Sequence, residues 1–116
     1  MYLREVRDIL SATVLSGEES LELEVHSACG SDFMSDVLAY VKDQALLLTG
    51  LVNPQVVRTA DMMDILCIVF VRGKKPGEEL VKMAERLDIA VLGTSLPMFS
   101  ACGILYGCGL RGGSIT

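Results

Sequence analysis

The stretch that decides the fold is DILCIVFVRGKKP, from Asp64 to Pro76. Its seven consecutive apolar residues, Ile65 to Val71, are rich in β-branched types and too few to cross a membrane as a helix. Such a run is typical of a strand that is buried on both faces of a parallel sheet. A basic turn, RGKK, follows directly, and Pro76 is expected to open a helix at its first position, where a missing N–H costs nothing. The sequence therefore predicts a central strand, a turn where a ligand is to be sought, and a helix.

Length and composition limit the classes of protein to consider. The chain has 116 residues, enough for one domain with a core that needs no disulfide or metal. It is 51% hydrophobic but lacks a run of the roughly 20 apolar residues that a membrane helix needs. Its first residues mix charges into an amphipathic pattern, unlike a signal peptide, so a cytoplasmic location is expected. The net charge of −5 argues against a nucleic-acid partner, because there is no basic excess to release counterions.

Elements on both sides of the central stretch follow from the same patterns. Apolar residues at helical spacing predict four more helices: 3–10, about 33–41 behind a cap at Ser31 or Asp32, one from Asn53-Pro54 onward, and one from Pro97 onward. Further strands are predicted at 12–15, at 21–28 as a half-exposed strand, at 45–48 after residues 42–44, and at 89–92. The expected fold class is α/β: one domain, residues 1–110, with a mostly parallel sheet of four or five strands and helices on both faces. The chain is expected to fray from Gly107, and residues 111–116 to form a flexible tail.

The carboxyl ends of the predicted strands carry small and polar residues. Parallel sheets bind ligands at these ends, at a topological switch point, and helix N-termini there offer free N–H groups to an anion. The candidate ligand-binding residues are Gly30, Ser31, Asp32, Thr49, Arg72, Gly73, Lys74, Thr94 and Ser95. The same residue types also serve as ordinary caps and turns, and this alternative stays open. Within the set, we expect Arg72 and Lys74 to form an anion site with the N–H groups near Ser31 and Thr94, because local positive charge stands out in an acidic protein.

The sequence assembles no catalytic centre. A phosphate loop of the Gly-x-x-x-x-Gly-Lys-Ser/Thr type does not occur. His26 is the only histidine, and its place on a predicted strand favours a packed or hydrogen-bonded ring over a catalytic one. The cysteines include no Cys-x-x-Cys pair, so reduced, mostly buried thiols are expected, with no metal and no cofactor; they are Cys29, Cys67, Cys102 and Cys108. The protein is therefore predicted not to be an enzyme.

The last predicted helix has apolar residues on more than one face. Phe99 and Tyr106 are its aromatic residues, and Gly103 and Gly107 permit another helix to approach closely. Two arrangements satisfy this pattern: the helix contacts a second copy of the chain, or Phe99 and Tyr106 fold over the edge of the sheet. The spacing of these residues alone leaves both arrangements open.

In the order and spacing of its motifs, the chain resembles the DRTGG domain family over about residues 2–110. The segments that carry the resemblance are Leu3 with Val6, VLSGEE at 14–19, VHSACGSDFMSDVL at 25–38, LTG at 48–50, VFVRGKKP at 69–76 and LGTSLPMFSACGILY at 92–106. A literal Asp-Arg-Thr-Gly-Gly string does not occur. The resemblance implies a fold like that of the N-terminal domain of bacterial HPr kinase/phosphorylase. The phosphate loop of that kinase belongs to a separate C-terminal domain, so kinase activity is not implied.

The resemblance also carries an expectation about function. Domains of this family occur inside phosphotransacetylases and beside CBS pairs in regulatory pyrophosphatases, generally as non-catalytic and often dimer-forming modules. Short members are often encoded near hydrogenase subunits. The first prediction is therefore a regulatory or ligand-binding module, homodimeric, which senses a nucleotide or other phosphorylated small molecule. The alternative is an accessory or assembly protein of a redox enzyme such as a hydrogenase, acting through protein–protein contacts.

Overall fold

One five-stranded sheet organises the computed structural model, which describes residues 1–41 and 45–112. The strands lie in the order β1 (Thr13–Ser16), β5 (Ala90–Gly93), β4 (Cys67–Phe70), β3 (Ala45–Thr49) and β2 (Ser27–Gly30). Strands β2 to β5 are parallel, and β1 pairs with β5 in the antiparallel sense at one edge. The predicted mostly parallel sheet is confirmed.

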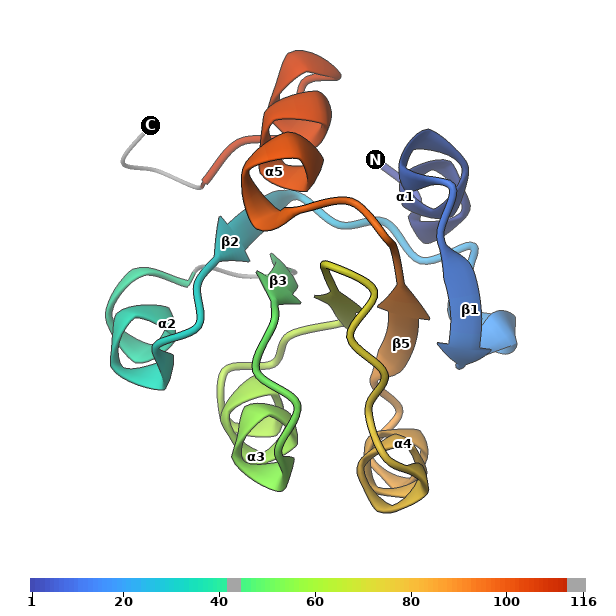
Figure 1. Ribbon diagram of the computed structural model, residues 1–116, viewed down its shortest axis with the longest axis vertical. Helices are drawn as coiled ribbons and strands as arrows, with labels where there is room; N and C mark the ends of the chain where they lie inside the picture. The colour runs from blue at the N-terminus through green and yellow to red at the C-terminus, as the bar shows by residue number, and fades with distance from the viewer. Residues whose placement is uncertain (42–44, 113–116) are drawn as a thin grey trace.

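Helices cover both faces of the sheet, as predicted (Figure 1). On one face lie α2 (Met34–Tyr40), α3 (Pro54–Met62) and α4 (Glu78–Arg86); on the other lie α1 (Leu3–Leu10) and α5 (Met98–Gly107). The crossovers from β2 to β5 all proceed in one direction along the sheet. Because such crossovers are right-handed, their three helices share a face. The helix that follows β5 goes to the opposite face, beside α1.

The central strand β4 is buried on both sides, as its apolar run predicts. Ile68 and Phe70 pack into the core under α2, α3 and α4. Cys67 and Val69 belong to the core under α1 and α5. Because side chains alternate along a strand, both cores draw on the same run, which leaves no polar position in it. The strand therefore lies in the middle of the sheet, flanked by β3 and β5.

One predicted helix start is confirmed and one is wrong. Asn53 caps α3, where its Oδ1 accepts a hydrogen bond from the N–H of Gln55 at 2.9 Å. Pro76, however, does not open α4, which begins at Glu78 with Gly77 at the N-cap. The chain first makes a tight turn after β4 and then needs the residues up to Gly77 to reach the helix layer. The proline is therefore part of the loop.

The predicted cap of α2 is also wrong. Phe33 occupies the N-cap and has no side-chain capping bond. The Ser31 hydroxyl accepts a hydrogen bond from the N–H of Phe33 at 3.0 Å, which forms a local turn before the helix. Asp32 makes its hydrogen bonds with the loop that follows β3. Both side chains thus stabilise the connection to the helix without capping it.

The half-exposed strand predicted at 21–28 is largely wrong. The chain after β1 forms a short 3₁₀ helix, η1 (Glu18–Ser20), and only the last residues of the segment enter the sheet, in β2. Between them, Tyr2 and Glu24 form an isolated antiparallel bridge, and the N–H of Val25 donates to the Met1 carbonyl at 2.7 Å. The alternating glutamates therefore run beside the start of α1, outside the sheet.

The chain stays packed beyond the predicted start of fraying. Helix α5 continues to Gly107, Leu110 is buried, and the Arg111 carbonyl accepts a hydrogen bond from the N–H of Ala28 at 2.9 Å. The prediction that the chain frays from Gly107 is therefore wrong for residues 107–111, because the buried Leu110 holds this segment against the sheet. Residues 42–44, the predicted link to β3, and residues 113–116 of the expected tail lie outside the described residues. None of the described helices combines the length and apolar character that crossing a bilayer requires.

Candidate functional site

The carboxyl ends of the parallel strands are in register at one edge of the sheet. Gly30 lies opposite Leu48, Thr49 opposite Phe70, and Phe70 opposite Gly93. The predicted residues therefore gather at this edge, but in two separate groups. One group surrounds the side chain of Asp32, and the other lines a pocket beside Lys74.

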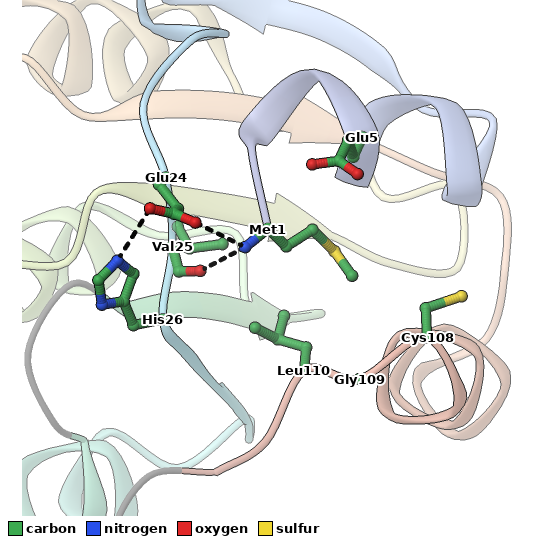
Figure 2. Close-up of a pocket in the computed structure, with 8 residues that line it drawn as sticks. All are labelled: Met1, Glu5, Glu24, Val25, His26, Cys108, Gly109 and Leu110. Atoms are coloured by element: carbon green, nitrogen blue, oxygen red, sulfur yellow. Dashed lines mark hydrogen bonds and ion pairs between the residues drawn. The ribbon is translucent and has the colours of Figure 1, made fainter.

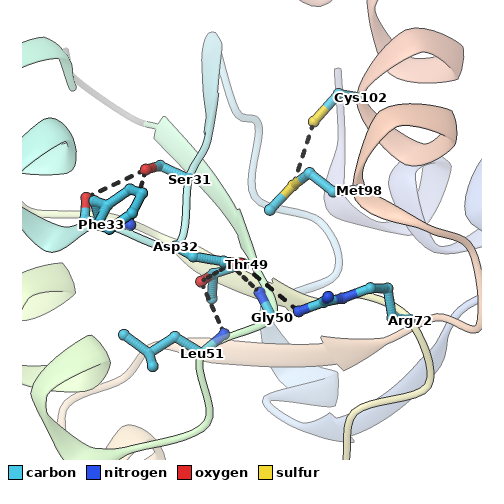
Figure 3. Close-up of polar contacts among 9 residues, drawn as sticks. All are labelled: Ser31, Asp32, Phe33, Thr49, Gly50, Leu51, Arg72, Met98 and Cys102. Atoms are coloured by element: carbon cyan, nitrogen blue, oxygen red, sulfur yellow. Dashed lines mark hydrogen bonds and ion pairs between the residues drawn. The ribbon is translucent and has the colours of Figure 1, made fainter.

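In the first group, Asp32 links the loops after three strands (Figure 3). Its Oδ1 accepts hydrogen bonds from the Thr49 hydroxyl at 3.1 Å and from the Gly50 N–H at 2.7 Å. Its Oδ2 lies 3.7 Å from Nη2 of Arg72. The Arg72 side chain passes so close to Gly50 that a Cβ there would make the guanidinium shift. Arg72 is thus already paired with a carboxylate within the protein.

The backbone of Arg72 adopts an unusual conformation. Its φ is 60°, in the left-handed region, and the next residue, Gly73, has a φ of 67°. A left-handed residue with a side chain costs about 1–2 kcal/mol. The conformation is held by two hydrogen bonds to the loop after β5: Arg72 N–H to the Leu96 carbonyl at 2.8 Å, and Gly73 N–H to the Thr94 carbonyl at 2.9 Å. The tight turn after β4 is therefore fastened to the neighbouring strand end.

The second group lines a pocket of about 540 Å³. Four of the predicted residues contribute to it: Gly73, Lys74, Thr94 and Ser95. The remaining lining residues come from β1, β5, the loop after β4 and the first half of α4; they are Thr13, Leu15, Lys75, Pro76, Glu78, Val81 and Gly93. The walls are mainly apolar, and two lysines supply positive charge. This combination suits a small amphipathic anion.

The topology of the sheet explains why a pocket forms there. After β4 the chain turns toward α4 on one face, and after β5 it turns toward α5 on the opposite face (Figure 1). The two loops separate at the strand ends, which is the arrangement that creates a binding crevice in parallel sheets. The predicted switch point therefore lies between β4 and β5.

Gly30 and Ser31 do not join the pocket. A Cβ at Gly30 would lie 2.6 Å from the Cys102 sulfur of α5, so Gly30 serves the packing of that helix. Ser31 forms the local turn before α2. The expected single site, with Arg72 and Lys74 joined by N–H groups near both Ser31 and Thr94, is thus divided between two places along the edge.

Some polar groups around the pocket already have hydrogen-bond or ion-pair partners within the protein, and others do not. The Thr94 hydroxyl is buried, donates to the Leu10 carbonyl at 2.9 Å and accepts from the Leu96 N–H at 3.3 Å. Glu78 forms an ion pair with Lys82 at 2.9 Å. Lys74 and Lys75 are exposed, and no salt bridge of the described residues includes either of them. Their charges are therefore available to a ligand.

The walls that β1 and α4 provide were not predicted from the sequence. Leu15 and Val81 are far apart in the chain, but β1 and α4 are in contact. The pairing of β1 with β5 brings Thr13 opposite Gly93. The short run of residues 13–16 between a helix and a glycine turn predicted a strand, but nothing local identified β5 as its partner.

A second cavity, of about 530 Å³, lies between the start of α1 and the end of α5 (Figure 2). Its charged lining includes Glu5 and Glu24, and Glu24 lies 3.6 Å from the Met1 amine and 3.3 Å from Nε2 of His26. His26 is exposed and hydrogen-bonded, in agreement with the predicted non-catalytic alternative. The two carboxylates make this cavity unfavourable for an anion.

The four cysteines are all free thiols. Burial raises the pKa of the Cys67 and Cys102 thiols. The pKa of Cys29 is raised chiefly by burial and further by the nearby Asp36 and Cys102. Neutral thiols are poor nucleophiles and poor metal ligands. Among residues 1–41 and 45–112, no group of three or more histidine, cysteine or carboxylate side chains is placed to hold a metal ion.

Comparison with known proteins assigns the family. The profile of the DRTGG domain matches residues 5–107. A solved structure, the CBS and DRTGG domains of the regulatory region of Clostridium perfringens pyrophosphatase complexed with its activator diadenosine tetraphosphate, matches with a TM-score of 0.74 at 16% identity. The match covers 90% of this chain and 45% of the other, so this chain spans about half the length of the chain in that structure. No curated protein sequence matches this one. Because the profile covers most of its length, the chain belongs to the DRTGG domain family.

Proposed function

We propose that this protein is a non-catalytic regulatory module that binds a phosphorylated small molecule in the pocket between the ends of β4 and β5. The proposal rests on one observation: Lys74 and Lys75 line the same cavity as residues at the strand ends. Those residues are Gly73, Thr94 and Ser95. The charges of the two lysines suit an anion, and the apolar walls suit an organic group attached to it. The related pyrophosphatase region is complexed with a nucleotide activator, which supports the ligand class.

We also propose that the module is a homodimer and works in the cytoplasm. Helix α5 has no charged residue, and Phe99 on its outer side is 90% exposed. A Cβ at Gly103 or Gly107 would have no neighbour within 4 Å, so a second helix has room to approach. Since the chain carries a net charge of −5, two copies associate best through an uncharged surface. The free thiols of all four cysteines suit a reducing compartment.

Calorimetric titration tests the ligand site. The parent protein, titrated with a panel of nucleotides and sugar phosphates, is expected to bind at least one of them. The double variant Lys74→Ala/Lys75→Ala should bind it at least tenfold more weakly, because each lysine contributes a charge-assisted contact. The double variant Arg58→Ala/Arg86→Ala removes the same charge from positions outside the pocket and should bind as the parent does.

The role of Arg72 requires its own variant, because it belongs to the other group of predicted residues. Its guanidinium is paired with Asp32 and does not line the pocket. Arg72→Ala should therefore weaken ligand binding less than Lys74→Ala does. Binding that survives the loss of both lysines, or that is lost equally in the arginine control, would contradict the proposed site.

A further inference from the structure

We propose that the ligand of the pocket is a nucleoside monophosphate, with its phosphate at Lys74 and Lys75 and its nucleoside against Leu15, Pro76 and Val81. This inference rests on the proposed function, since it names the ligand class of the same site. It follows from three properties of the pocket: its charge, its apolar wall and its size.

The charge of the pocket matches a single phosphate group. Lys74 and Lys75 are its two cationic lining residues. A phosphate monoester carries about −1.5 to −2 charges at neutral pH, which two lysines balance. A triphosphate would bring more negative charge than the pocket neutralises. It would also meet the carboxylate of Glu78, which lines the pocket, in a chain whose net charge is already −5.

The apolar wall requires more than a phosphate or a sugar phosphate. Leu15 is 39% exposed on the edge strand, where it packs beside Gly93. Val81 faces the same pocket from α4, and Pro76 closes it from the loop. Contact with a flat base would remove this apolar surface from water. The hydroxyls of Thr13 and Ser95, which are exposed at the pocket, are available to the ribose.

The size of the pocket fits a mononucleotide. Its volume of about 540 Å³ is within the usual range for small-molecule sites, roughly 300–1,000 Å³. Gly93 also lines the pocket and has no side chain to fill it. A Cβ at this position would lie 3.4 Å from a Leu15 methyl group. That distance is an ordinary van der Waals contact, so Gly93→Ala should fold normally while reducing the space for a base.

The test compares ligands and variants by calorimetric titration. The probes are the four ribonucleoside 5′-monophosphates, ATP, adenosine, ribose 5-phosphate and inorganic phosphate. At least one monophosphate should bind the parent tenfold or more tightly than its triphosphate, and tenfold or more tightly than ribose 5-phosphate. If AMP is not the monophosphate that binds, the corresponding nucleoside and triphosphate replace adenosine and ATP.

The variants separate the two ends of the ligand. Leu15→Asn should weaken binding of the monophosphate about tenfold and leave ribose 5-phosphate unchanged; Gly93→Ala should act in the same direction. Leu87→Asn is the matched control, because Leu87 is also 39% exposed but lies at the far end of α4, outside the pocket. Lys74→Ala/Lys75→Ala should weaken every phosphorylated probe and spare the nucleoside.

Two kinds of failure are distinguishable. If ribose 5-phosphate binds the parent as well as the monophosphates do, or if Leu15→Asn and Gly93→Ala change nothing, the nucleoside assignment is overturned while the phosphate site stands. If no phosphorylated probe binds, or if Lys74→Ala/Lys75→Ala does not weaken binding, the proposed function itself is contradicted. The assignment of a nucleoside monophosphate is then contradicted as well.

Discussion

The Cys67 side chain on β4 is closed to water from both faces of the sheet. It is 0% exposed, and its burial raises the pKa of the thiol well above its usual range. In the unfolded chain a cysteine ionises at about pH 8.5. Above that pH the unfolded state loses the proton and the folded state keeps it. The contribution to stability is therefore complete below about pH 8.5 and is lost as the pH rises.

Because the pKa of the Cys67 thiol is raised on folding, the free energy of unfolding should fall more steeply at alkaline pH in the parent than in Cys67→Ala. Above about pH 9, the buried thiol should lower the free energy of unfolding by about 1.4 kcal/mol per pH unit. Urea unfolding between pH 7 and pH 10 measures the profile, and the difference in slope removes the contribution of other groups. Cys108→Ala, at an exposed position, should follow the parent's profile. Parallel profiles for Cys67→Ala and the parent would show that the thiol ionises in place.

Among the secondary-structure elements, the strand ends are joined by Asp32. Its carboxylate connects the chain after β2 with Thr49 and Gly50 at the end of β3, and with Arg72 after β4. The hydrogen bonds to Thr49 and Gly50 satisfy donors that are partly or fully buried. The ion pair with Arg72 is about half exposed on both sides, and such pairs contribute little. The hydrogen bonds are therefore the main contribution of this residue.

We expect Asp32→Ala to lower the free energy of unfolding by about 2–3 kcal/mol, because it leaves the Gly50 N–H and the Thr49 hydroxyl without their acceptor. Arg72→Ala should cost less than about 1 kcal/mol. Chemical denaturation of both variants gives the comparison. Asp61→Ala, which removes an exposed carboxylate from the end of α3, should stay within about 0.5 kcal/mol of the parent. If Arg72→Ala lowers the free energy of unfolding as much as Asp32→Ala does, the ion pair, and not the hydrogen bonds, is the main contribution of Asp32.

At the scale of the whole molecule, the outer side of α5 is an apolar surface that the fold leaves open. Phe99 is 90% exposed and Tyr106 is 53% exposed, so Phe99 does not fold over the sheet as one of the two predicted arrangements required. Tyr106 is partly covered by its own chain, because the Arg111 guanidinium lies 3.9 Å from its ring centre. Phe99 is thus the residue with the most surface to offer a partner.

The dimer predicts a change of mass with one substitution. Light scattering at micromolar concentration should give a dimer for the parent and a monomer for Phe99→Glu, since a charge placed at both copies of an apolar contact is repelled and desolvated. Phe33→Glu is the matched control: Phe33 is 70% exposed, lies before α2, and should leave the dimer intact. A monomer mass for the parent that does not change with concentration would rule out the dimer.

The sequence by itself determined the elements whose causes are local. The seven apolar residues from Ile65 to Val71 are typical of a strand that is buried on both faces, and β4 is that strand. Leu3, Val6 and Leu10 repeat at helical spacing and form the buried side of α1. Asn53 caps α3 through a bond that spans two residues. Each of these signals lies within a few residues of the structure it predicts.

Only the tertiary structure decided how distant residues were combined. Asp32 had two possible sets of partners, the helix start beside it and the loop after β3, and the alignment of the strand ends selected the second. The pocket needed Leu15 and Val81, which meet because β1 pairs with β5 and α4 packs against both. The division of the predicted site followed from the opposite turns of the chain after β4 and β5. Such pairings depend on contacts between segments far apart in the chain, and no local pattern of residues encodes them.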